Sequence, residues 1–145
     1  YWTIAATAVC VAATCIYAPF FAKKPEKTLD RMDSTFVEEL KALDAKRLYT
    51  SYNDGGFVIY HGMQSFVDSR ADLFPADAID ASVQMGLAAN TSERALQDNI
   101  EKYNFDAILL NRSESKTCIE IMDLLPDWQR AIENDYYIVY TPVSK

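Results

Sequence analysis

The feature that most constrains this chain is its first segment, residues 1–22, which contains no charged side chain. A helix of about 20 apolar residues crosses the ~30 Å hydrocarbon core of a bilayer. Tyr1 and Trp2 at one end, and Tyr17 and Lys23 toward the other, are residue types that occupy membrane interfaces. We therefore predict a transmembrane helix over residues 1–22, with a signal peptide or a buried core helix as the alternatives.

All charged residues, 14 basic and 21 acidic, follow residue 22 and give the chain a formal net charge of −7. This acidic balance argues against nucleic acid as a partner, because phosphate recognition depends on clustered Lys and Arg. The basic cluster Lys23, Lys24 and Lys27 fits a juxtamembrane stem over residues 23–33. Residues 34–145 then form a soluble domain with one modest core. Because the sequence does not begin with Met, we expect it to be a piece of a longer protein.

Turn residues and prolines divide residues 34–145 into short helices and strands. Apolar residues spaced three and four apart predict helices over 35–43, 75–87, 92–103 and 113–125, with Ser34 or Asp33 capping the first and Thr91 or Ser92 the third. Aromatic and β-branched runs predict strands over 47–52, 57–60, 65–68, 105–110, 128–132 and 136–141. For residues 57–60 a short helix is the alternative, and the last two strands are predicted to form an antiparallel hairpin.

The strand over residues 105–110 is a nearly continuous apolar run, which is typical of a strand buried on both faces. We expect it at the centre of the sheet. The predicted fold class is α/β: a mixed, mostly parallel sheet with helices on both faces and a C-terminal antiparallel hairpin, preceded by the transmembrane helix.

Several motifs of residues 48–142 resemble one family. They are Tyr52-Asn-Asp-Gly-Gly-Phe-Val-Ile-Tyr60, Phe66-Val-Asp-Ser-Arg-Ala-Asp-Leu-Phe74, Tyr103-Asn-Phe-Asp-Ala-Ile-Leu-Leu110 and the stretch from Trp128 to Tyr140. This pattern is similar to the C-terminal extracytoplasmic domains of bacterial polytopic membrane proteins of the glycosyltransferase-C, mannosyltransferase-like superfamily. The chain departs from the pattern at Asp54, where the family usually has an aromatic residue, and at Ser69, where it usually has Gly.

The resemblance implies a multi-pass parent protein that transfers sugar from a polyprenyl-phosphate donor. It implies that residues 34–145 form an accessory domain on the outer side of a bacterial membrane, and that the catalytic acid lies in an earlier loop of the parent. Lys23, Lys24 and Lys27 would instead favour a cytoplasmic domain under the positive-inside tendency. We follow the resemblance, because orientation in a multi-pass protein depends on all its loops.

Three groups of residues are candidates for ligand binding. Asp68, Arg70 and Asp72 alternate along a predicted extended segment, so an arginine held between two carboxylates could bind a phosphate or a sugar acid. Gly55 and Gly56 could let the backbone approach a ligand. For both groups we favour a structural role: an ion pair at a sheet edge for the first group and a turn for the two glycines.

The third candidate, His61, is the only histidine and could act as a general base or sense pH, although a loop histidine without a catalytic partner is the simpler interpretation. Cys118 is expected to be a buried, inert thiol. No sequence motif for a catalytic triad or a metal site is present, so no catalytic residue, metal or cofactor is predicted. Six tyrosines could stack on a sugar ring: Tyr49, Tyr52, Tyr60, Tyr136, Tyr137 and Tyr140. Packing in the core or at its rim is the more usual role of tyrosines in strands.

The function predicted from the sequence is therefore a non-catalytic, extracytoplasmic accessory domain of a glycosyltransferase-like membrane protein. Its expected partners are the membrane, the remainder of its own polytopic chain and a lipid-linked sugar, with the domain positioning a sugar acceptor or polyprenyl-phosphate donor. The alternatives are a single-pass, membrane-anchored protein-interaction domain of the cell envelope and an independent enzyme using Asp68, Arg70 and His61.

Overall fold

The computed structural model describes residues 31–86 and 91–143. The chain divides into two units, Tyr1–Asp30 and Arg31–Lys145, and the described residues belong to the second. The predicted transmembrane segment 1–22 and most of the stem lie outside the described residues. Within the described ranges, no helix combines the length and apolar character that crossing a bilayer requires.

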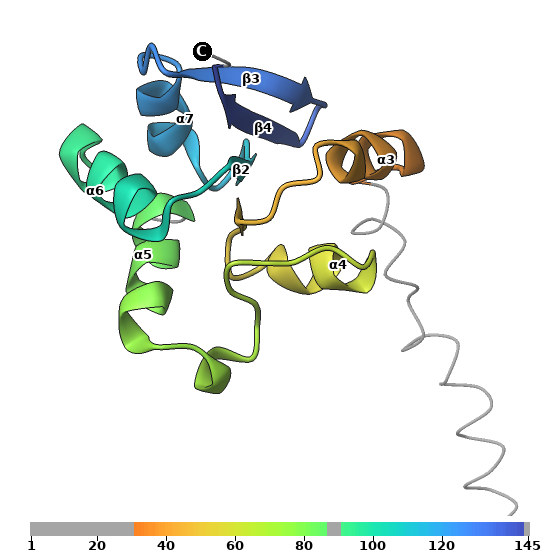
Figure 1. The fold of residues 1–145 in the computed structure, drawn as a ribbon, viewed down its shortest axis with the longest axis horizontal. Helices are drawn as coiled ribbons and strands as arrows, with labels where there is room; N and C mark the ends of the chain where they lie inside the picture. The colour runs from red at the N-terminus through yellow and green to blue at the C-terminus, as the bar shows by residue number, and fades with distance from the viewer. Residues whose placement is uncertain (1–30, 87–90, 144–145) are drawn as a thin grey trace, which may run out of the picture. The chain divides into compact units, whose positions relative to one another are not determined.

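A sheet of four strands in the order β1-β2-β4-β3 forms the centre of this unit (Figure 1). The strands are β1 (Leu48–Tyr49), β2 (Ala107–Asn111), β3 (Trp128–Glu133) and β4 (Tyr137–Pro142). Strands β1 and β2 pair in parallel, whereas β2 with β4 and β4 with β3 pair antiparallel. The prediction of a mixed sheet is confirmed, with the apolar strand in its interior and the hairpin at its edge. The prediction that the sheet is mostly parallel is wrong, because two of its three pairings, β2 with β4 and β4 with β3, are antiparallel.

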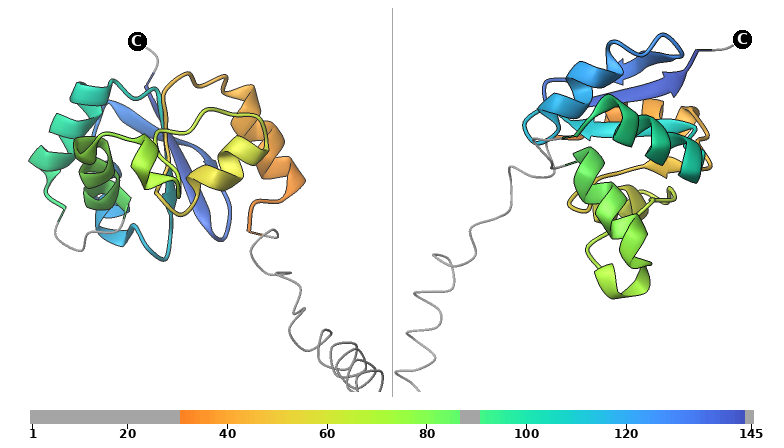
Figure 2. Two further views of the ribbon diagram at one scale, coloured as in Figure 1. Left: turned by 90° about the horizontal axis from the view of Figure 1, so that it is seen from below. Right: turned by 90° about the vertical axis from the view of Figure 1, so that its left-hand side faces the viewer.

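Helices cover both faces of the sheet, as the sequence predicts (Figures 1 and 2). Helices α3 (Ser34–Ala42) and α4 (Gly55–Tyr60) lie on one face, and α5 (Ala76–Gly86), α6 (Glu93–Tyr103) and α7 (Lys116–Met122) lie on the other. A hydrophobic core lies on each face of the sheet, and the side chains of β2 alternate between the two. Ala107 and Leu109 pack in the core under α3 and α4, and Ile108 and Leu110 pack in the core under α5, α6 and α7. All four side chains are fully buried, which explains why the strand is apolar throughout.

The helix starts follow from local hydrogen bonding. The Asp33 carboxylate accepts from the Phe36 backbone N–H at 2.8 Å and caps α3, whose Phe36, Val37 and Leu40 are buried. The Ser92 hydroxyl accepts from the Ala95 N–H and caps α6. These two caps and the inward face of α3 confirm the sequence prediction.

The segment after β1 differs from the prediction. Residues 57–60 are helical, which is the alternative that the sequence leaves open, and belong to α4; Gly62, two residues after the end of this helix, has φ of +81°. There the N–H groups of Gly62 and Met63 donate to the carbonyls of Ile59 and Val58. Residues 65–68 form no strand; the Phe66 N–H donates to the Leu48 carbonyl at 3.1 Å, so this irregular segment lies along the outer edge of β1.

Candidate functional site

The structure brings Asp68 and Arg70 together but not Asp72. The Asp68 side chain is 2 % exposed and accepts from the Arg70 backbone N–H at 2.8 Å and from its guanidinium at 2.6 Å. These hydrogen bonds from Arg70 lower the pKa of Asp68. The predicted alternation fails because residues Ala71–Leu73 form a 3-10 turn (η1), which leaves Asp72 exposed and without a hydrogen bond or ion pair in the described part of the chain.

Gly55 and Gly56 have different roles. A Cβ atom on Gly55 would lie 1.9 Å from the Val67 carbonyl oxygen and 2.6 Å from the Ser65 hydroxyl. Gly55 therefore lets the start of α4 pack directly on residues 65–67, and the close approach is to the chain itself rather than to a ligand. A Cβ atom on Gly56 would meet nothing within 4 Å.

His61 lies directly after α4, where its ring contacts Phe57 with centroids 4.4 Å apart and Tyr60 with centroids 5.1 Å apart. Its imidazole makes no hydrogen bond within residues 31–86 and 91–143. The general-base interpretation would need a carboxylate partner to orient the ring, and the described residues supply none. His61 does, however, line a cavity.

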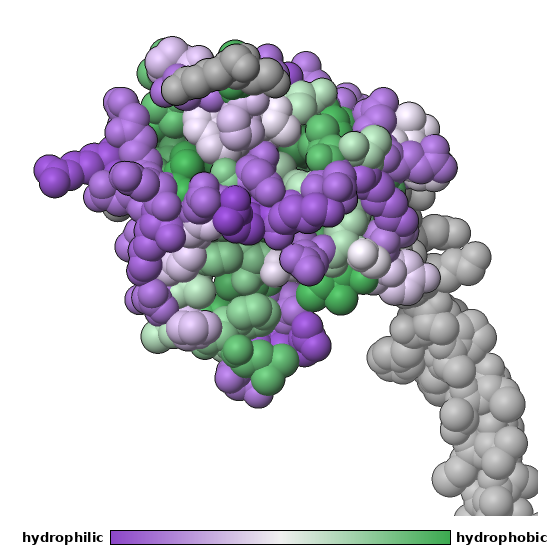
Figure 3. All heavy atoms as spheres, viewed as in Figure 1, coloured by the Kyte–Doolittle hydropathy of each residue, from purple (hydrophilic) through white to green (hydrophobic). Residues whose placement is uncertain are grey.

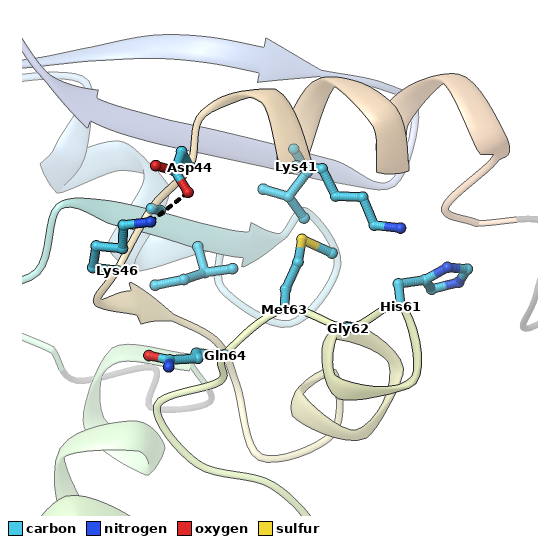
Figure 4. A pocket seen from close by; sticks show the side chains of 10 residues that line it. Lys41, Asp44, Lys46, His61, Gly62, Met63 and Gln64 are labelled. Atoms are coloured by element: carbon cyan, nitrogen blue, oxygen red, sulfur yellow. Dashed lines mark hydrogen bonds and ion pairs between the residues drawn. The ribbon is translucent and has the colours of Figure 1, made fainter.

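This cavity of about 420 Å³, which we call the cationic cavity, lies between α3, the amino end of β1 and the turn after α4 (Figure 4). Figure 4 shows Lys41 and His61 on one side and the Asp44–Lys46 ion pair on the other. Its apolar wall includes Leu40, Leu48 and Met63, with Gln64 at the rim.

A second cavity of about 260 Å³, the aromatic cavity, shares Lys46, Leu48 and Gln64 with the first. Phe66 meets Tyr103 edge-on at a centroid distance of 4.7 Å and Phe105 at 4.8 Å. The hydroxyl of Tyr103 donates to Asp77 at 3.2 Å, which fixes the ring. Because the two cavities share three residues, we treat them as one groove and call it the amino-edge groove. Its lining adds Arg47 and Ser65 to the residues named above.

The lining of the amino-edge groove contains more positive than negative side chains: Lys41, Lys46 and Arg47 against Asp44. The carboxylate of Asp106, which lies nearby, accepts the backbone N–H groups of Lys46 and Arg47 at 2.9 Å each. Lys41 has no ion-pair partner among residues 31–86 and 91–143. A region of positive charge therefore lies on a chain whose net charge is −7.

A buried hydrogen-bond network lies at the opposite, carboxyl end of β1, and protein groups satisfy both oxygens of its carboxylate. One oxygen of the Asp54 carboxylate accepts from the Ser51 hydroxyl at 2.6 Å and the other from the Tyr137 hydroxyl at 2.8 Å. Burial raises the pKa values of Asp54 and Tyr137. The sequence does not reveal this network, because Asp54 and Tyr137 are 83 residues apart. Since both carboxylate oxygens are occupied by protein donors, we interpret the network as structural.

The remaining candidates from the sequence are Cys118 and the tyrosines, and none of them lines the amino-edge groove. Cys118 is buried, as predicted, and burial raises its pKa to about 12, which makes the thiol inert. Tyr49, Tyr137 and Tyr140 are buried in the cores, whereas Tyr60 and Tyr136 are exposed and Tyr52 donates to the Ser69 carbonyl. The tyrosine that lines the groove is Tyr103, which the sequence places only on a helix face.

Among the described residues, no three His, Cys, Asp or Glu side chains are placed to hold a metal ion. Comparison of the chain with models of protein families, with curated proteins and with solved structures gives no match. The functional argument therefore depends on the geometry of the groove and on the motifs of the sequence.

Proposed function

We propose that residues 34–145 form a non-catalytic accessory domain that positions a sugar-bearing substrate through the amino-edge groove. The observation that supports this most is the aromatic cavity, in which Phe66, Tyr103 and Phe105 lie beside Arg47, Gln64 and Ser65. Sugar rings bind to sites of this composition because their C–H faces pack on aromatic rings while polar side chains bond the hydroxyls.

An accessory role fits the placement of the groups that could do chemistry. Asp68 is bound to Arg70, Asp54 is bound to Ser51 and Tyr137, and Cys118 is buried. The ring of His61 packs on Phe57. In each case the structure gives the side chain a packing or positioning partner, so the groove supports binding better than catalysis.

The membrane context of the proposal comes from the sequence. The charge-free residues 1–22, the basic stem and the motif resemblance support an extracytoplasmic domain of a polytopic glycosyltransferase-like protein in a bacterial membrane. In that setting the groove would hold a sugar acceptor or the sugar of a polyprenyl-phosphate donor near the bilayer. Alkaline phosphatase, which is active only outside the cytoplasm, fused after Lys145 in the full-length protein tests this orientation: an active fusion supports it and an inactive one contradicts it.

Sugar binding is tested by replacing the ring that lines the groove. Tyr103→Leu removes the aromatic surface, Tyr103→Phe keeps it, and Tyr136→Leu changes an exposed tyrosine outside the groove. Saturation-transfer NMR on the full chain in detergent, with a panel of neutral and acidic monosaccharides, should show transfer in wild type, Tyr103→Phe and Tyr136→Leu and lose it in Tyr103→Leu. Equal transfer to all four proteins, or none to wild type, would contradict the proposal.

Exposed apolar side chains favour one alternative, a membrane-anchored interaction domain of the cell envelope. Tyr60 is 79 % and Leu73 62 % exposed. Figure 3 shows hydrophobic surface at the end of the molecule that includes η1. If this alternative holds, Tyr60→Ser with Leu73→Ser should abolish chemical crosslinking of the full-length protein to other envelope proteins and leave sugar binding intact; unchanged crosslinking would exclude it.

A further inference from the structure

We infer that the ligand of the amino-edge groove is an anionic saccharide, a sugar ring that bears a carboxylate or a phosphate. This inference rests on the proposed function and adds the chemical class of the ligand. It assigns the sugar ring to the aromatic cavity and the negative group to the cationic cavity, which meet at Lys46, Leu48 and Gln64.

The charges of the groove select the sign of the ligand. Lys41 lies in the last turn of α3 with an exposed side chain, and no carboxylate within residues 31–86 and 91–143 pairs with it. On a chain of net charge −7, an anion approaching most of the surface is repelled, so local positive charge is needed to hold it. In the groove, Lys41, Lys46 and Arg47 outnumber the lining Asp44 and the nearby Asp106, which leaves an excess of one positive charge.

The two cavities lie side by side, so one small ligand can occupy both. The volume of the cationic cavity is about 420 Å³, within the range of about 300–1,000 Å³ for small-molecule sites, and that of the aromatic cavity is about 260 Å³, just below this range. Inorganic phosphate would contact only the charged side chains of the cationic cavity, and the ring of a neutral sugar would use only the aromatic cavity. The juxtaposition therefore favours a ligand that combines a ring with a charge.

Asp44 provides a test in which affinity should rise. It holds Lys46 in an ion pair and so reduces the positive charge available to the ligand. Its backbone has φ of +49°, in the left-handed region that asparagine tolerates as well as aspartate. Asp44→Asn should therefore keep the turn, free Lys46 and strengthen anion binding, a gain that unfolding cannot imitate.

The test is a calorimetric titration of the full 145-residue chain in detergent with glucose, glucuronate, glucose 1-phosphate and inorganic phosphate. We expect the two charged sugars to bind about tenfold more tightly than glucose or phosphate alone. Lys41→Gln should weaken binding of the charged sugars about threefold, and Asp44→Asn should strengthen it by a similar factor. Lys116→Gln, an exposed lysine on α7 outside the groove, should change nothing.

The outcomes separate this inference from the proposed function. Binding of glucose as tight as that of the charged sugars, or a preference unaffected by Lys41→Gln and Asp44→Asn, would overturn the inference and leave sugar binding standing. Phosphate binding as tightly as glucose 1-phosphate would overturn it as well, because the ring would then contribute nothing. Attaching a short isoprenyl chain to the sugar phosphate distinguishes the sources: tighter binding identifies a lipid-linked head group and unchanged affinity a free sugar, and both support the anionic saccharide.

Discussion

Adjacent glycines at the start of α4 should respond in opposite directions to the same substitution. In Gly55→Ala the new Cβ would lie 1.9 Å from the Val67 carbonyl oxygen. That carbonyl cannot retreat freely, because it accepts hydrogen bonds from the hydroxyls of Thr50 at 3.2 Å and Ser65 at 2.5 Å. Forcing extra volume into packed structure costs about 1–3 kcal/mol, and a backbone obstacle places this case near the upper limit. We therefore expect a loss of about 3 kcal/mol.

Gly56→Ala is the matched control, with the same chemical change one residue later in the same helix. A Cβ there meets nothing within 4 Å, and alanine restricts the unfolded chain more than glycine does. We expect a gain of about 0.5 kcal/mol.

Urea denaturation followed by circular dichroism measures both free energies of unfolding, with similar m-values required for the comparison. In thermal unfolding, Gly55→Ala should lower the midpoint by roughly 10 °C. The reasoning would be refuted if Gly55→Ala changed stability by less than about 0.5 kcal/mol, or if the two variants were equally destabilised.

Three further predictions concern stability. Burial raises the pKa of Asp54, so the contribution of this residue to stability is present below the usual aspartate pKa and is lost as pH rises. Asp54→Asn lacks this titration, so its unfolding free energy minus that of wild type should increase between about pH 4 and pH 7 in urea titrations. A difference that stays constant with pH would contradict this. Gly62→Ala places a Cβ at φ of +81° and should cost about 1 kcal/mol in the same assay, whereas no loss would show that the turn relaxes. Asp68→Ala should lower the urea midpoint while Asp72→Ala stays within about 0.5 kcal/mol of wild type, and equal effects would argue against the ion pair with Arg70.

Much of the fold could be predicted from the sequence, because its signals are local. The cap at Asp33, the face formed by Phe36, Val37 and Leu40, and the buried strand β2 each depend on residues within a few positions of one another. The C-terminal hairpin is predictable for the same reason. The apolar run of residues 105–110 predicts a parallel surrounding, but full burial on both faces also suits a strand such as β2, which pairs with β1 in parallel and with β4 antiparallel. Residues 57–60 and 65–68 have β-prone side chains, yet they form part of α4 and an irregular segment, which pack closely together at Gly55.

The candidate site was less predictable, because it joins distant parts of the chain. Lys41 and Tyr103 line neighbouring cavities although they come from α3 and α6. A helical pattern cannot distinguish an aromatic residue that packs wholly inside from one that also borders a cavity. His61 was a candidate as the only histidine, and the structure places it in the groove beside Lys41 rather than beside a nucleophile. Asp68 and Arg70 were predicted as a pair, and the turn at η1 removed Asp72 from it.

The most direct test of the central claim, that the amino-edge groove binds a sugar, is a titration of the ¹⁵N-labelled chain with glucuronate followed through its backbone amide resonances. The account predicts saturable shifts at Lys46, Gln64 and Tyr103. It predicts little change at Asn111 and Tyr136, which lie at the end of the sheet where β1 and β2 terminate. Shifts confined to that opposite edge, or no saturable shift at any residue, would contradict it.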